Sequence, residues 1–115
     1  MKKDILDYIE DIIIATDQAI MFIEDMEYDS FVKDDKTNSA VMRKLEIIGE
    51  AVKNISANIK KKHTEIPWKD MAGMRDKLIH EYFGINLKRV WKTVKEDLPD
   101  LKEKIEKLRD IYEEK

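Results

Sequence analysis

Hydrophobic residues recur at three- and four-residue steps through most of this chain, the period of helices that are buried along one side. The pattern predicts a first helix over about residues 3–27 and a second from about Thr37 or Ser39 to Lys62. Between them, residues 28–38 are rich in Asp, Ser and Asn, which favours a loop. Two long helices joined by such a loop would pack antiparallel.

Three shorter helices are predicted in the rest of the chain. The first begins near Trp68, after Pro67, and ends at the helix-stopping Gly84. Asn86 caps the next, and Pro99 opens the last. The fold class is therefore all-α, an up-down helical bundle of about five helices, two long and antiparallel and three shorter.

Additional apolar residues flank the stripe of the first helix. Ile14 and Met21 widen that stripe, so this helix is expected to pack against two neighbours. With 115 residues, the chain is long enough for one core, and we expect a single helical domain over residues 1–115.

The composition excludes several classes of protein. There are no cysteines and only two histidines, far apart, so we expect no disulfide, no metal site and no cofactor. No apolar run approaches the roughly 18 residues of a membrane helix. The acidic residues among the first eleven do not fit a signal peptide. These features predict a soluble, cytoplasmic protein that makes no membrane contact.

Charge is unevenly distributed along the chain. The net charge is −3, yet residues 51–95 carry 11 basic and 4 acidic side chains. A basic middle third between acidic ends is expected where a polyanion approaches one region and is repelled elsewhere. The alternative is that these are ordinary solvated helix faces, because a block of sequence need not form one surface patch.

The candidate chemistry lies within this basic third, in the segment from Arg75 to Tyr82. Arginine can hold a phosphate, histidine can move a proton near neutral pH, and tyrosine offers a modifiable hydroxyl. On a helix Arg75 and Tyr82 share a face, whereas Arg75 and His80 are about 140° apart. Either the helix ends or bends near His80, or a second copy of the chain supplies the missing partner. In the alternative reading, His80 only interacts with the helix dipole and Arg75 is solvated.

Other catalytic motifs are missing from the sequence. It contains no glycine-rich phosphate loop, no paired carboxylates at metal-ligand spacing and no nucleophile elbow. The sequence therefore leaves two possibilities open: metal-independent acid/base chemistry on a phosphate, or no catalysis at all.

The pattern Arg75, four residues, His80, one residue, Tyr82 resembles the HEPN superfamily, and specifically the HepT-like ribonuclease toxins. The resemblance extends over essentially the whole chain. It includes Ile48-Gly49-Glu50-Ala51 in the second helix, Pro67-Trp68 before the motif, and Val90-Trp91 and Asp97-Leu98-Pro99 after it.

This resemblance implies a homodimer of helical bundles with the motif in a cleft between protomers. It implies a toxin that cleaves RNA with Arg75 and His80 as catalytic residues, with Asp76 and Lys77 as possible accessory residues. It also implies a cognate nucleotidyltransferase antitoxin of the MNT type, which would neutralise the toxin by transferring AMP to Tyr82. Tyr82 would thus be either this modified residue or one that binds the substrate.

A second hypothesis keeps the fold and the partner but removes the chemistry. The chain would then be a non-catalytic helical subunit that binds a nucleotidyltransferase and could bind nucleotides for it. Intact Arg75 and His80 favour the enzyme, because a pure adaptor would not need both.

Overall fold

The computed structural model describes residues 4–80 and 86–114, and the side chains of all of these except residues 75–80. In chain order its elements are α1 (Ile5–Ile23), α2 (Tyr28–Lys33), α3 (Asp35–Lys53), α4 (Ala57–Lys62), α5 (Trp68–His80), α6 (Leu87–Lys92), the π-helical segment η2 (Thr93–Asp97) and α7 (Leu98–Glu113). Residues 4–80 and 86–114 contain no β-strand. The predicted all-α class is confirmed.

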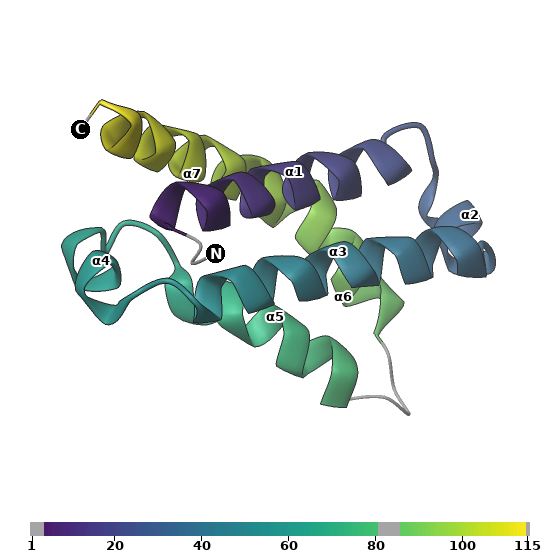
Figure 1. The fold of residues 1–115 in the computed structure, drawn as a ribbon. Helices are drawn as coiled ribbons and strands as arrows, with labels where there is room; N and C mark the ends of the chain where they lie inside the picture. The colour runs from purple at the N-terminus through teal and green to yellow at the C-terminus, as the bar shows by residue number, and fades with distance from the viewer. Residues whose placement is uncertain (1–3, 81–85, 115) are drawn as a thin grey trace.

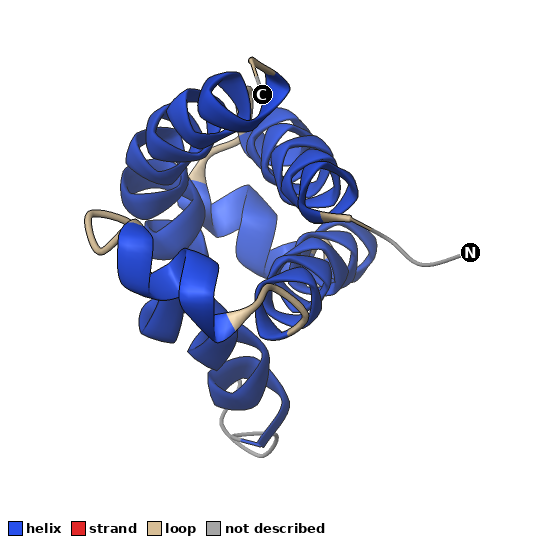
Figure 2. Cartoon of the chain, turned by 60° about the vertical axis from the view of Figure 1, so that its left-hand side comes forward, coloured by secondary structure: helices blue, strands red, loops and turns tan. Residues whose placement is uncertain are grey.

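The long helices run up and down beside one another (Figure 1). α1 lies antiparallel to α3 on one side and to α7 on the other, and α5 packs along α3. Turned by 60°, the molecule shows its helices arranged around a common centre (Figure 2). The predicted up-down bundle is therefore what the structure forms.

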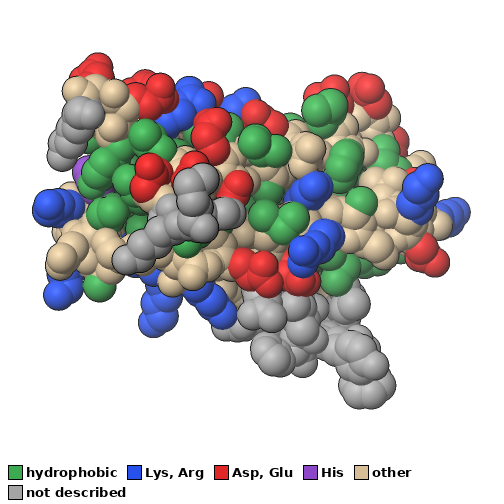
Figure 3. All heavy atoms as spheres, viewed as in Figure 1, with side chains coloured by type: hydrophobic (Ala, Val, Ile, Leu, Met, Phe, Trp, Pro, Cys, Tyr) green, Lys and Arg blue, Asp and Glu red, His purple; other side chains and the backbone are tan. Residues whose placement is uncertain are grey.

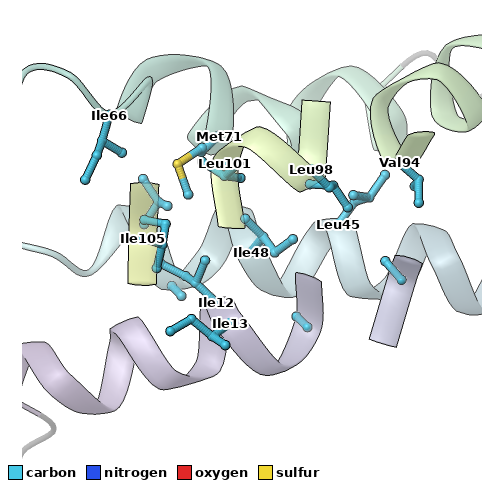
Figure 4. Close-up of a cluster of buried hydrophobic side chains, with 14 of the residues drawn as sticks. Ile12, Ile13, Leu45, Ile48, Ile66, Met71, Val94, Leu98, Leu101 and Ile105 are labelled. Carbon is cyan, nitrogen blue, oxygen red and sulfur yellow. The ribbon is translucent and has the colours of Figure 1, made fainter. Parts of the chain in front are cut away.

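One hydrophobic core fills the space between these four helices. Each helix contributes fully buried side chains, including Ile12 from α1, Ile48 from α3, Met71 from α5 and Ile105 from α7. These side chains meet in the interior (Figure 4). Met71 and Trp68 tie α5, the helix of the predicted motif, into the core.

The predicted loop at residues 28–38 is wrong, because this segment is mostly helical. α2 occupies its first half, and α3 begins at Asp35 after the single residue Asp34. Asp34 caps α3 by accepting hydrogen bonds from the Thr37 amide at 3.0 Å and the Thr37 hydroxyl at 2.7 Å. The Thr37 hydrogen bonds lower the pKa of Asp34 below its usual value. Asp and Ser, interpreted as turn formers, instead occupy helix starts and an exposed helix face.

The second predicted helix is interrupted. α3 ends at Lys53, and a short turn separates it from α4. Asn54 takes the C-cap of α3, and the Ser56 hydroxyl accepts a hydrogen bond from the Ile59 amide at the start of α4. Asn and Ser compete with helical backbone bonds and so favour such ends. Ile55, between them, is 4% exposed, so the break places an apolar side chain in the core.

The prediction that Pro99 opens the last helix is confirmed, because α7 begins at Leu98 and Pro99 lies in its first turn. The residues before it are helical as well, since the backbone continues from α6 through η2 into α7. The fixed φ of proline suits the first turn of a helix. The predicted Asn86 cap is confirmed, since its side chain accepts a hydrogen bond from the Arg89 amide at 3.1 Å.

α1 packs against two neighbours, α3 and α7, as predicted. Ile14 and Met21, the residues predicted to widen its buried stripe, are nevertheless 52% and 58% exposed. α7 also forms partly exposed ion pairs with α1, Lys102 with Asp17 at 2.7 Å and Arg109 with Glu10 at 3.3 Å. Hydrogen bonding to Asp17 raises the pKa of Lys102. None of the helices in the described ranges combines the length and apolar character needed to cross a bilayer.

Candidate active site

The start of α5 is fixed by contacts with the preceding turn. The indole Nε1 of Trp68 donates a hydrogen bond to the His63 carbonyl at 2.9 Å, and the Met71 amide donates to the Pro67 carbonyl. Trp68 and Met71 are both buried. These contacts set the direction of a helix that runs about 20 Å to His80.

The structure places four of the predicted site residues on the final turns of α5. Arg75, Asp76, Lys77 and His80 all lie within Trp68–His80, and Tyr82 lies outside the described residues. The backbone is α-helical through His80, so the positions of Arg75 and His80 stay about 140° apart around the axis. Within one chain, Arg75 and His80 therefore occupy positions on different sides of α5.

The surface beside the start of this motif is open. Gly73 lies two residues before Arg75, and a Cβ built on it would meet no described atom within 4 Å. A glycine inside a helix costs about 1 kcal/mol relative to alanine. Packing within the described part of the chain does not explain why a glycine occupies position 73.

Sequence reasoning missed an acidic cleft on one side of α5. Its volume is about 470 Å³, and it lies between the first half of α5 and the junction of η2 with α7. Pro67, Met71, Met74 and Leu101 line it together with the carboxylates Asp70, Glu96, Asp97 and Asp100. Because Asp70 and Glu96 are far apart in the sequence, no local pattern reveals this cleft. Its charge opposes the approach of a polyanion from this side.

Folding also divides the basic middle third into separate groups. One group surrounds α4 and the start of α5, where Lys61, Lys62 and Lys69 are exposed. Figure 3 shows Lys and Arg side chains gathered at this left-hand end of the molecule. The other lies on α6, which follows the motif in the chain, and includes Lys88 and Lys92. α4 and α6 are well separated (Figure 1). The described cations of the basic middle third therefore belong to two separate groups on the surface.

The described residues contain no group of three or more His, Asp or Glu side chains able to hold a metal ion. The second histidine of the chain, His63, caps α4 away from the motif. Its Nε2 lies 3.1 Å from the Tyr112 hydroxyl, and its ring meets the Tyr112 ring edge to face. These contacts give His63 a packing role between α4 and α7.

Known proteins similar to this chain match it over most of its length. A "Probable ribonuclease HepT" of Thermococcus cleftensis is 54% identical over 95% of this chain and 99% of its own. A Methanocaldococcus jannaschii protein named "Putative RNase" is 46% identical over 99% and 98% of the two chains. A protein of the same description from Caldanaerobacter subterraneus subsp. tengcongensis is 43% identical over 88% and 90%. No solved structure gives a significant match.

The family model described as "Ribonuclease HepT-like" matches residues 5–108, which include α1 to α6, η2 and most of α7. The matched range contains the whole Arg75–Tyr82 motif. The resemblance noted from the sequence is thereby confirmed, and so is the predicted class of enzyme. The chain belongs to the HepT-like ribonuclease family.

Proposed function

We propose that this protein is the RNA-cleaving toxin of a toxin–antitoxin pair, a metal-independent endoribonuclease that acts through Arg75 and His80. The observation that carries the proposal is the family match over residues 5–108, which spans the motif on α5. Basic surfaces on both sides of the motif in the chain, around α4 and on α6, are compatible with an RNA substrate.

RNA supplies the nucleophile for this chemistry. The 2′-oxygen attacks the neighbouring phosphorus, the bond from phosphorus to the 5′-oxygen breaks, and a 2′,3′-cyclic phosphate forms. His80 accepts the 2′-proton or protonates the leaving 5′-oxygen. Arg75 donates hydrogen bonds to the phosphate oxygens as charge develops on them. Neither step requires a metal ion.

The test is cleavage of a defined RNA by the purified protein in excess EDTA. We expect cleavage to persist and the new 3′ ends to carry cyclic phosphate or its opened form. RNA left intact by the wild-type protein, with and without added divalent ions, would favour the non-catalytic subunit instead.

We propose further that the active form is a homodimer in which the motif residues of the two copies face a shared groove. The 140° separation of Arg75 and His80 on a regular helix supports this arrangement, because a twofold axis lets each copy complete the site of the other. The open surface at Gly73 allows close approach of a second chain to α5.

Mixing inactive variants tests this shared site. Arg75→Ala and His80→Ala homodimers should each be inactive, whereas subunit exchange should restore about a quarter of the wild-type activity. Half of the randomly mixed dimers are heterodimers, and one of the two sites in each heterodimer keeps both residues. Measuring cleavage before and after exchange decides the point. Dimers that exchange fully, by mass spectrometry, yet stay inactive would show that each site lies within one chain.

We propose, third, that a nucleotidyltransferase antitoxin silences the toxin by transferring AMP from ATP to Tyr82. The Tyr82 oxygen attacks the α-phosphorus of ATP, pyrophosphate leaves, and the tyrosine proton passes to solvent or a base. Tyr82 and Arg75 are seven residues apart, and thus on one face if the helix continues. An adenylyl phosphate near Arg75 would compete for the charge that holds the RNA backbone.

The substitution Tyr82→Phe separates control from folding. The ring remains but the acceptor hydroxyl is removed, so we expect wild-type RNA cleavage and no mass increase after incubation with antitoxin and ATP. The matched control is Tyr112→Phe on α7, which should still be modified and silenced. Equal modification of Tyr82→Phe and the wild type would show that the modified residue is another one.

A further inference from the structure

The surface of α6 and of the η2 segment that continues it is strongly basic. Lys88, Arg89, Lys92 and Lys95 are exposed, and residues 86–95 contain no Asp or Glu. Lys88, Lys92 and Lys95 follow one another at four and three residues, so they lie along one side of the helix, and Arg89 lies beside them. The result is a row of positive charge about 10 Å long.

Most of these cations have no carboxylate partner. Among the described residues, no ion pair involves Lys88, Arg89 or Lys92. The cations of α7 differ, because each contacts a carboxylate: Lys102 with Asp17, Lys104 with Asp100, Lys107 with Glu103 and Arg109 with Glu113. The chain therefore neutralises its positive charge on α7 and leaves it available on α6.

Aromatic packing fixes α6 in place. The half-buried Trp91 ring lies 5.2 Å from the Phe31 ring and 5.8 Å from the Tyr28 ring, both of α2. The Lys95 ammonium lies 4.9 Å from the centroid of the Trp91 ring, a cation–π contact. The charged row is thus carried by a helix anchored to the bundle, so binding along it would cost little ordering of the backbone.

The basic row lies a short distance along the chain from the motif. Lys88 is eight residues after His80, so a chain of that length places the two within about 28 Å at most. The opposite sign of charge occurs at the end of η2 and the start of α7, where Glu96, Asp97 and Asp100 line the acidic cleft. A polyanion held at α5 is therefore attracted toward α6 and repelled from the cleft.

We propose that the basic row Lys88, Arg89 and Lys92 of α6, with Lys95 of η2, binds the phosphate backbone of the RNA strand that leaves the cleavage site. This inference rests on the proposed ribonuclease function and extends it to a second binding surface. Lysine and arginine on a helix exterior contact phosphates without reading bases. The row would therefore strengthen binding of longer RNAs irrespective of sequence.

The test measures RNA binding by the full-length protein as a function of salt. The probe is a fluorescently labelled single-stranded 2′-O-methyl oligonucleotide, which lacks the nucleophile and cannot be cut. In the triple variant Lys88→Gln, Arg89→Gln and Lys92→Gln, we expect weaker binding. The slope of log affinity against log salt should fall by about two, the value for three lost phosphate contacts on a single strand.

The control variant removes three charges at the other basic surface, Lys61→Gln, Lys62→Gln and Lys69→Gln. It should retain more of the wild-type slope than the α6 variant. All six residues are exposed, so both variants should keep the wild-type melting temperature. An unchanged slope in the α6 variant, or an equal decrease in both variants, would overturn the proposal. The proposal would also be overturned if the α6 variant bound RNA normally but no longer bound a protein partner.

A cleavage assay separates this proposal from the proposed function. The proposal places the basic row on nucleotides beyond the scissile bond, so the α6 variant should raise the KM of a long RNA more than the KM of a dinucleoside phosphate. A wild-type protein that cuts neither substrate contradicts the ribonuclease function, and the salt-dependence result still decides the role of α6.

Discussion

Replacing His80 by alanine is expected to reduce RNA cleavage by about 100-fold or more, because positioned general acid/base groups contribute on the order of 10² to 10⁴ to such reactions. Arg75→Ala should cause a loss of similar size, since charge developing on the phosphate would lose its hydrogen-bond donor. Initial rates on a defined RNA in EDTA measure both effects. Circular dichroism should show wild-type helix content in each variant.

The other histidine provides a matched control. His63 contacts Tyr112 and lies at the end of α4, so His63→Ala should cleave RNA near the wild-type rate. It should lower the melting temperature, because the contact with the Tyr112 hydroxyl and the ring packing are lost. If His80→Ala retained full activity, or if His63→Ala lost as much as His80→Ala, the assignment of His80 would be wrong.

Replacing Ile48 by alanine is expected to reduce the free energy of unfolding by about 2–5 kcal/mol, the range for removing a large aliphatic side chain from a packed core. Ile48 is fully buried on α3, and it lies in the interior cluster with Ile12, Met71 and Leu101 (Figure 4). A cavity there would loosen α3 against both α1 and α5. Urea titration at one fixed protein concentration measures the change, since self-association also affects apparent stability.

Ile14 is the corresponding exposed position. The same deletion at Ile14, which is 52% exposed on α1, should change the free energy of unfolding by less than about 0.5 kcal/mol in the isolated chain. Equal losses at Ile14 and Ile48 would mean that Ile14 is covered in solution, and the loss at Ile14 would then depend on protein concentration.

The features that the sequence predicted correctly depend on local patterns. The apolar period of α1 and the cap at Asn86 involve residues within a turn or two of one another, so their physical cause is visible in the sequence itself. The up-down arrangement followed because short connections between long helices leave few alternatives.

The errors arose where tertiary packing outweighs local preference. The segment at residues 28–38 has the composition of a loop, yet burial of Phe31 and the cap at Asp34 make it helical. The break at Asn54 depends on burying Ile55. The exposure of Ile14 could not be predicted, because an apolar residue at helical spacing does not reveal whether a neighbour covers it.

The candidate site was predictable in part. Resemblance to a family identified the motif, and the structure confirms that Arg75 and His80 lie on one helix. The acidic cleft joins Asp70 of α5 to Asp100 of α7, and only folding brings them together. The same applies to charge, because residues counted as one basic block belong to surfaces that the bundle separates.

The positions of the two tryptophans have a practical consequence. Trp68 begins α5 with its indole bonded to a carbonyl, and Trp91 lies on α6 beneath the Lys95 ammonium, so the pair brackets the motif in the chain. The Trp91 ring lies next to an ammonium group, whereas the Trp68 indole donates a hydrogen bond to a carbonyl. The two rings therefore emit from different surroundings. The intrinsic fluorescence of this protein thus provides two built-in optical probes, one on each side of the motif, and neither requires a label.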